Sequence, residues 1–274
     1  MKLGIATGVY LNYPLHAAIE QIADAGYDTL DIWSGRPHVY RHDFTAKELI
    51  DLRLKIEGLG LSVSSFLPAF HRYPYTLSSP NDSVRSDSIQ YMKECMENAV
   101  LLGAPIVLIV PERSLVGQSV EDAWNRLVDS VVQVCDYADQ FEIRLGIEAV
   151  NHFVSDLVTT ASEAMKVIDE VNHEKLGVVI DSGHMNLSSE TISEAINMPG
   201  DKLLQVHVND NDGQHQQNLI PGEGTFNFFE LIQELGKVRF KGVLTAELGY
   251  HYTFDPTPAV IENVRRMRSY LENA

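Results

Sequence analysis

Four residues whose side chains bind metals or transfer protons follow four successive apolar runs in the second half of the chain. They are Glu148 in Arg-Leu-Gly-Ile-Glu, Asp181 in Gly-Val-Val-Ile-Asp, His207 in Leu-Gln-Val-His-Val and Glu247 in Leu-Thr-Ala-Glu. An unpaired charge beside a buried strand costs on the order of several kcal/mol, and converging groups avoid that cost when they share a cation. Three carboxylates and one imidazole suit Mn²⁺, Mg²⁺ or Co²⁺, with Zn²⁺ as a further candidate.

The elements that must position these residues alternate along the whole chain. Eight short apolar runs resemble parallel strands that are covered on both faces: 3–6, 29–33, 61–67, 106–110, 144–148, 176–181, 203–208 and 243–247. Longer runs with helical periodicity lie between them: 13–25, 83–102, 120–140, 160–171, 226–235 and 258–271. This alternation predicts an α/β fold, a single (β/α)8 TIM barrel that occupies residues 1–274 as one domain.

A doubly wound open sheet is the competing fold. Such a sheet often has a glycine-rich phosphate turn after its first strand, where this chain has Gly8 alone. In a barrel, catalytic groups lie at the carboxyl ends of the strands. Each of the four residues taken alone is more commonly a strand-end charge that reaches solvent, but four on consecutive strands predict one shared metal site.

Composition and charge exclude several classes of protein. With 38 acidic and 21 basic residues, the formal charge is −17, which opposes binding to a nucleic-acid backbone. No run approaches the roughly 18 apolar residues of a membrane span, and the first residues do not resemble a signal peptide. Cys95 and Cys135 lack the spacing of a metal or disulfide framework. We therefore expect a cytoplasmic protein.

Several motifs resemble the xylose-isomerase-like TIM-barrel superfamily of sugar isomerases and epimerases. They are Asp181-Ser182-Gly183-His184, His207-Val208-Asn209-Asp210, Ile220-Pro221-Gly222-Glu223-Gly224 and the final Glu247. Within that superfamily, the segments Asp31-Ile32-Trp33-Ser34-Gly35-Arg36-Pro37-His38 and Tyr73-Pro74-Tyr75 are most similar to the fructoselysine 3-epimerase branch of the ketose 3-epimerases. The resemblance extends over nearly the whole chain.

The resemblance implies a metal-dependent epimerase that acts on a small sugar. One divalent ion, Mn²⁺ or Co²⁺ above the other candidates, would be bound by Glu148, Asp181, His207 and Glu247. Glu148 and Glu247 would lie on opposite faces of C3, where one removes a proton to give an enediolate and the other returns a proton. His184 would hydrogen-bond a substrate oxygen near C2. The family also implies a homo-oligomer, either a dimer or a tetramer.

Three further residues are candidates for contact with the sugar or its substituent. Trp33 and Arg36 follow the second strand and offer an aromatic face and a planar donor. Tyr75, together with Tyr73, follows the third strand and is expected to form a wall of the pocket. Packing is the alternative role for Trp33 and for both tyrosines, and a loop-capping role is the alternative for His184.

Two positions depart from the pattern of the free-ketohexose 3-epimerases. Those enzymes have an arginine where this chain has Gly213, and a glutamate where it has Val154. The first difference argues against tagatose or psicose and agrees with the fructoselysine branch. The second removes a contact to the C1 end of the substrate, for which His152 is a candidate replacement.

Other functions remain open at this point. A ketose–aldose isomerase similar to hydroxypyruvate isomerase, or an inosose dehydratase, would use the same metal ligands. An endonuclease IV-like nuclease would need further histidines after the third and fourth strands, where His71 is present but Val110-Pro111-Glu112-Arg113 contains none. His215 is its other candidate, in the seventh-strand loop. A non-enzymatic barrel that binds a structural cation is the last alternative.

Overall fold

The structure is a computed structural model that describes residues 1–69 and 75–273. Eight parallel strands close into a barrel in sequence order, and β8 pairs with β1. Their bounds are β1 Lys2–Ala6, β2 Thr29–Ser34, β3 Ser62–Pro68, β4 Ile106–Ile109, β5 Arg144–Ala149, β6 Leu176–Asp181, β7 Leu203–Val208 and β8 Val243–Ala246. The predicted TIM barrel is confirmed.

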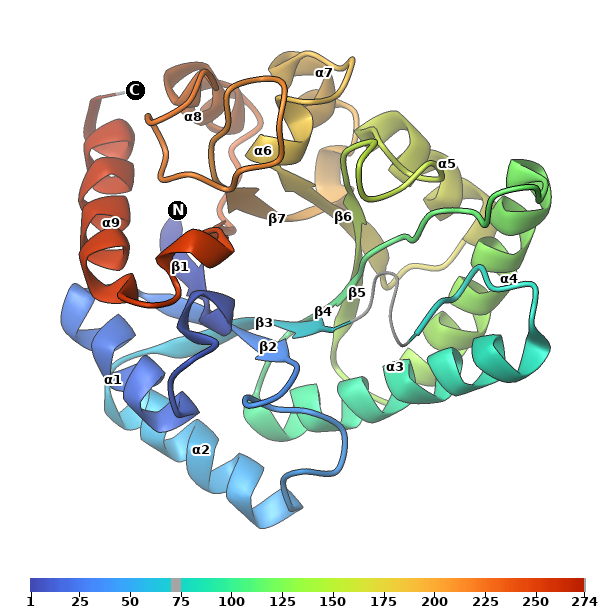
Figure 1. Cartoon of the computed structure of the whole chain (residues 1–274), viewed down its shortest axis with the longest axis horizontal. Coiled ribbons are helices and arrows are strands. Elements are labelled where there is room, and N and C mark those ends of the chain that lie inside the picture. The colour runs from blue at the N-terminus through green and yellow to red at the C-terminus, as the bar shows by residue number, and fades with distance from the viewer. Residues whose placement is uncertain (70–74, 274) are drawn as a thin grey trace.

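Helices surround the barrel on its outer side (Figure 1). They are α1 Leu15–Ala25, α2 Ala46–Gly58, α3 Asp82–Leu102, α4 Val120–Ala138, α5 Ala161–Val171, α6 Ser182–Met185, α7 Ile192–Asn197, α8 Phe228–Lys237 and α9 Pro256–Asn273, with 3-10 turns at Thr7–Tyr10, Gly200–Lys202 and Tyr250–Tyr252. The six helical runs expected from the sequence do not include α2, α6 or α7. Four and six residues are too few for α6 and α7 to show a helical period.

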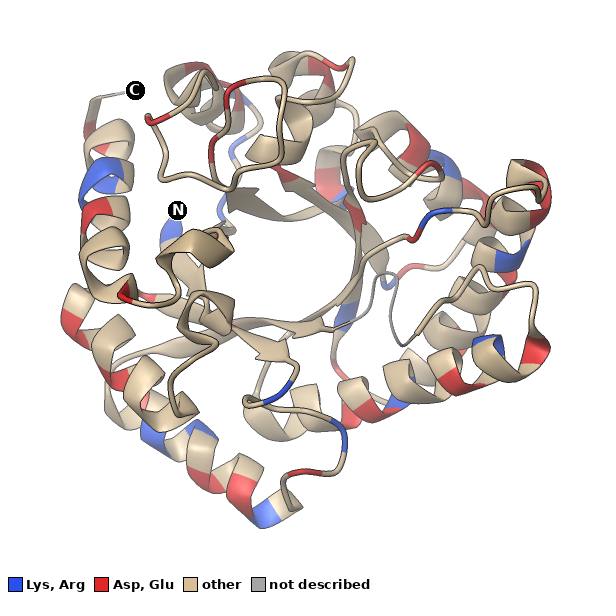
Figure 2. Ribbon diagram, in the orientation of Figure 1, with Lys and Arg blue, Asp and Glu red and all other residues tan. Residues whose placement is uncertain are grey.

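The hydrophobic pattern explains why the helices form an outer layer around the inner layer of strands. In α1 the buried residues Leu15, Ala18, Ile19 and Ile22 follow three- and four-residue spacing, so one face of the helix packs on the barrel. In β6 every residue is buried, as expected of a strand covered on both sides. Most charged residues lie on the surrounding helices and loops (Figure 2).

Two irregularities interrupt the strand pairing. The register between β2 and β3 shifts between Leu30 and Asp31, and the register between β6 and β7 shifts between Val178 and Val179. Bulges of this kind redirect side chains near active sites. No helix in the described part of the chain is both long and apolar enough to cross a membrane.

Candidate active site

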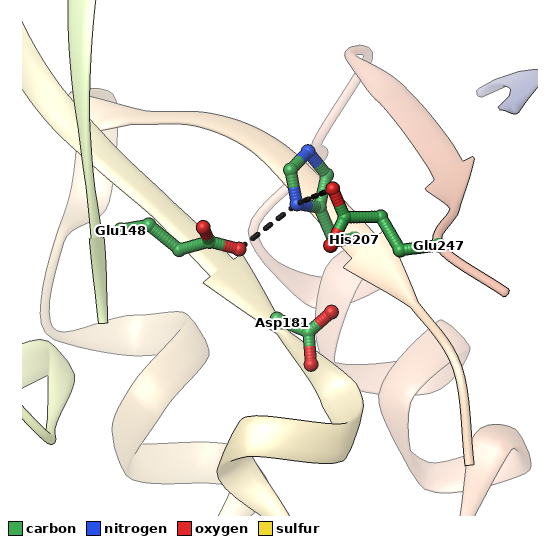
Figure 3. A group of neighbouring side chains, drawn as sticks. All are labelled: Glu148, Asp181, His207 and Glu247. Atoms are coloured by element: carbon green, nitrogen blue, oxygen red, sulfur yellow. Dashed lines mark hydrogen bonds and ion pairs between the residues drawn. The ribbon is translucent and has the colours of Figure 1, made fainter. Parts of the chain in front are cut away.

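The four predicted residues meet at one rim of the barrel (Figure 3). Glu148 lies in β5, Asp181 ends β6, His207 lies in β7, and Glu247 follows β8 directly. One ligand atom from each residue lies within 4.8 Å of those from the other three. Pairing of β6 with β7 places Asp181 opposite His207, so the barrel register itself brings two of the four together.

His207 lies between the two glutamates. Its Nδ1 is 2.9 Å from Glu148 Oε1 and 3.6 Å from Glu247 Oε1. The His207 and Glu148 side chains are almost completely buried, whereas 24% of the Glu247 side chain is exposed. The two glutamates therefore approach one common atom from strands on different parts of the barrel ring.

Asp181 is oriented by the short turn that follows it. Its Oδ1 accepts a hydrogen bond from the His184 amide at 2.7 Å, and its Oδ2 accepts one from Asn209 Nδ2 at 2.5 Å. A Cβ atom at Gly183 would overlap the Asn209 side-chain oxygen. Glycine at this position therefore lets Asn209 reach Asp181, which accounts for part of the Asp-Ser-Gly-His motif.

The electrostatics of the cluster favour a bound cation. Burial raises the pKa of Asp181 and raises the pKa of Glu247 to about 8, and the negative charge of Glu148 adds to both effects. Burial disfavours the charged form of His207, but the carboxylates of Glu247 and Glu148 outweigh it and raise its pKa well above the usual range. Crowded acids beside one imidazole form a hard donor set that fits a divalent cation.

A cavity of about 840 Å³ opens above these residues. Glu148, Glu247 and His184 lie on its wall, as do Trp33 and Val154. The Nδ1 atom of His184 is 2.7 Å from the side-chain amide nitrogen of Asn151, which leaves Nε2 for a bound molecule. The structure thus brings the two glutamates, His184 and Trp33 to one cavity.

The segment around Gly-Arg-Pro-His fixes the position of Trp33. The Trp33 amide donates to Thr7 Oγ1 at 3.0 Å, and His38 Nδ1 lies 3.1 Å from the same oxygen. The rings of Trp33 and His38 meet edge to face at 6.1 Å. A Cβ atom at Gly35 would overlap the Trp33 ring, so glycine is required for this ring position.

Arg36 lies outside the cavity lining. It forms two hydrogen bonds to Asp43, at 2.6 and 2.8 Å, and its side chain is 69% exposed. The guanidinium is thus bound by an acid seven residues further along, and a contact between Arg36 and the substrate stays a prediction.

Tyr75 also lies outside the cavity lining. It packs in the core, where its ring stacks on Tyr91 at 4.0 Å and its hydroxyl contacts Tyr40 and Arg41. The structure therefore assigns Tyr75 to packing rather than to the wall of the cavity. Tyr73 and His71 lie outside the described residues.

His152 does not take the place of the family glutamate at Val154. Its side chain is exposed, lies against Phe153 and is absent from the described cavity lining. Val154 itself lines the cavity and is nearly buried. An apolar side chain therefore occupies this position in the cavity lining.

Polar residues of two late loops line the cavity and were missed in the sequence analysis. Gln216, Gln217 and Asn218 come from the segment between β7 and α8, and His251 follows β8. Asn218 Nδ2 donates to the Glu247 backbone oxygen at 3.2 Å. Their position after barrel strands is the one feature of the sequence that could have identified them, because a loop has no hydrophobic periodicity.

The Ile-Pro-Gly-Glu-Gly motif shapes a loop rather than the metal cluster. The buried Asp210 carboxylate accepts hydrogen bonds from the amides of Asn211, Gly222, Gly224 and Phe226, at 2.8 to 3.1 Å. A Cβ atom at Gly224 would overlap Asp210 and the Asn211 backbone. The motif therefore closes this loop on Asp210.

Comparison with known proteins places the chain among sugar epimerases. It is 25% identical to fructoselysine 3-epimerase of Escherichia coli O157:H7 over 271 residues, which is 99% of this chain and 98% of the relative. It is 24% identical to D-psicose 3-epimerase of Ruminiclostridium cellulolyticum over 235 residues, 84% of this chain and 76% of the relative.

Solved structures share the fold over nearly the full length. L-Ribulose 3-epimerase superposes with a TM-score of 0.86 at 19% identity, covering 99% of this chain and 95% of that chain. The IOLI protein, solved with a zinc atom, superposes with a TM-score of 0.84 at 20% identity, covering 100% and 99%. The model of the xylose isomerase-like TIM barrel family matches residues 19–270. The chain therefore belongs to the xylose isomerase-like TIM barrel family.

Proposed function

We propose that this protein is a divalent-metal-dependent ketose 3-epimerase, with residues 1–274 acting as one catalytic unit. Glu148 and Glu247 are its two proton-transfer groups, and Asp181 and His207 complete the metal site. One observation carries the proposal. The two glutamates, one in β5 and the other directly after β8, approach the same His207 nitrogen and line the same cavity.

Inversion at a carbon requires two groups on opposite sides of it. One glutamate takes the C3 proton, and the other gives a proton to the opposite face of the resulting enediolate. A divalent cation in this site supplies Lewis-acid polarisation, which makes the C3 proton acidic enough for a carboxylate to remove. His184, whose ring is fixed by Asn151, donates a hydrogen bond to a sugar oxygen through Nε2.

The cavity wall favours an unphosphorylated substrate. Among the described residues, no lysine or arginine lines the cavity, so the usual partners of a phosphate group are missing. Val110, Val150 and Val154 form an apolar part of the wall. We propose that this part accepts the methylene chain of an amino acid attached to C1, as in fructoselysine or psicoselysine.

Hydrogen exchange tests the proposal directly. The protein, loaded with Mn²⁺ or Co²⁺, is incubated in D₂O with fructoselysine, psicoselysine, tagatose or psicose, and the sugars are analysed by NMR after protein and metal are removed. We expect deuterium at C3 and formation of the 3-epimer, fastest for the lysine adducts. Deuterium at C1 or C2 would instead identify a ketose–aldose isomerase, loss of water a dehydratase, and no exchange a structural cation site.

A further inference from the structure

A layer of polar side chains lies inside the barrel beneath the candidate metal site. Asp31, Ser64, Gln205 and Thr245 are all buried, and three of them have no exposed surface. The interior of a TIM barrel is usually filled by branched apolar residues. Burial of a carboxylate is costly in free energy unless hydrogen bonds or an opposite charge compensate it, so Asp31 needs such partners.

Asp31 is held by two hydrogen bonds from different strands. Its Oδ1 accepts from Ser64 Oγ at 2.5 Å, and its Oδ2 accepts from Gln205 Nε2 at 2.6 Å. Gln205 Nε2 also donates to Thr245 Oγ1 at 2.7 Å. Contacts within the protein alone therefore fix the Asp31 carboxylate in one orientation.

Both donors lie at the irregularities in the strand pairing. Ser64 is the extra residue of β3, because Leu30 pairs with Val63 and Asp31 pairs with Ser65. Leu204 is the extra residue of β7, because Val178 pairs with Leu203 and Val179 pairs with Gln205. Gln205 therefore directly follows the bulge. The two bulges thus have a shared result, since each directs a donor onto the same buried carboxylate.

The remaining neighbour of Asp31 is His207. The Asp31 Oδ2 atom lies 3.5 Å from His207 Nε2, on the opposite side of the ring from the Nδ1 atom that faces Glu148 and Glu247. His207 Nε2 is buried and has no hydrogen-bond partner at normal geometry among the described residues. Asp31 is therefore the acceptor positioned for its proton.

We propose that Asp31 is a positioning residue that holds the Nε2 proton of His207, so that Nδ1, once a metal ion displaces its proton, presents its lone pair among the three carboxylates. This inference rests on the metal site of the proposed function. A metal-binding histidine commonly donates its other ring N–H to a carboxylate, which fixes both the tautomer and the ring orientation. Ser64 and Gln205 act one step further out, by fixing Asp31.

The test is the metal affinity of Asp31→Asn, measured by calorimetry with Mn²⁺ in the absence of substrate. Three donors share the two oxygens of Asp31, and asparagine has only one acceptor oxygen for them. We expect the dissociation constant for Mn²⁺ to rise by about 10- to 100-fold. A value within about threefold of the wild type would overturn the inference, as would a wild-type protein that does not bind the metal.

Glu112→Gln is the matched control. Glu112 is a buried acid that follows β4, and it contacts none of the four candidate ligands through a described hydrogen bond. We expect its Mn²⁺ affinity to match that of the wild type. If Glu112→Gln weakened binding as much as Asp31→Asn, the effect would be a general consequence of changing a buried acid, and the inference would fail.

A second measurement begins with the wild-type protein and so does not depend on a variant that folds. In wild-type protein with ¹⁵N-labelled histidine and bound Zn²⁺, we expect the His207 Nε2 atom to carry a proton that exchanges slowly with solvent. In Asp31→Asn that proton should exchange faster, because its carboxylate acceptor is gone. An unprotonated Nε2 in the wild type would overturn the inference. Both readouts omit the sugar, so a protein that binds metal but does not epimerise would fail only the proposed function.

Discussion

The side chains of Glu148 and Glu247 both face His207 Nδ1, and in the proposed reaction they serve opposite faces of a bound sugar. We predict that Glu148→Gln and Glu247→Gln each reduce epimerisation by about 10²- to 10⁴-fold, the range typical of a lost general acid or base. Each variant keeps one proton-transfer group. We therefore expect residual deuterium exchange into one epimer only, and into a different epimer for each variant.

The measurement follows both epimers in D₂O, with circular dichroism to verify the fold and Glu112→Gln as the buried-acid control. Epimerisation at more than about a tenth of the wild-type rate in either variant would contradict the two-base arrangement. So would residual exchange into the same epimer in both variants, because that result would assign both glutamates to one face.

The residues that the sequence identified are those whose position depends on the strand pattern. Glu148, Asp181, His207 and Glu247 follow apolar runs, so the barrel alone was enough to predict that they meet. Arg36 and Tyr75 were less predictable, because their partners Asp43 and Tyr91 lie on segments whose approach no periodic pattern reveals. The cavity residues of the late loops were missed for the same reason.

Among the elements, the eight strands were predictable because helices bury their outer faces and the barrel interior buries their inner faces, which gives continuous apolar runs. The short helices α6 and α7 and the two bulges were not predictable, since they involve too few residues to alter a period. The bulges nevertheless determine how Asp31, Ser64 and Gln205 come together. The supports of the site thus depend on local departures from regular structure.

Glu112 connects the loops after β3, β4 and β5 and provides a test at the level of elements. Its Oε1 accepts from the Leu77 amide at 2.5 Å, and its backbone oxygen accepts from Ser155 Oγ at 2.6 Å. Burial raises the pKa of the Glu112 carboxyl to about 7. Folding therefore favours the protonated form of this side chain.

The sign of the pH dependence follows from this raised pKa. Below pH 4.5 the side chain is protonated in both states, and between pH 4.5 and about 7 only the unfolded chain loses the proton, so stability falls as pH rises. The difference corresponds to about 3 kcal/mol at roughly 1.4 kcal/mol per pH unit.

Glu112→Gln stays neutral, so its stability does not fall in this way. We predict that the melting temperature of this variant, relative to that of the wild type, increases as the pH rises from 4.5 to 8. Thermal unfolding of both proteins across this range provides the measurement. A difference between the two melting temperatures that does not change with pH would show that Glu112 does not titrate in this way.

At the scale of the whole molecule, a formal charge of −17 and three acids within one cluster favour the metal-loaded state over the apo state. A ligand that binds only the folded protein stabilises it by about 2.7 kcal/mol at roughly 100 times its dissociation constant. For a chain of this size, that stabilisation raises the melting temperature by about 5 °C. We therefore predict such a rise when Mn²⁺ or Co²⁺ is added to chelator-treated protein.

The size of the shift should depend on the cluster and not on the general acidity of the surface. Asp181→Asn removes one proposed ligand, so it should lose most of the shift. Asp212→Asn removes an exposed acid from the loop between β7 and α8, and it should retain the shift. Differential scanning calorimetry of the three proteins, with and without each metal, measures the effect. Equal shifts in all three would mean that cations stabilise the chain by screening its net negative charge, and the cluster would lose its assignment as the metal site.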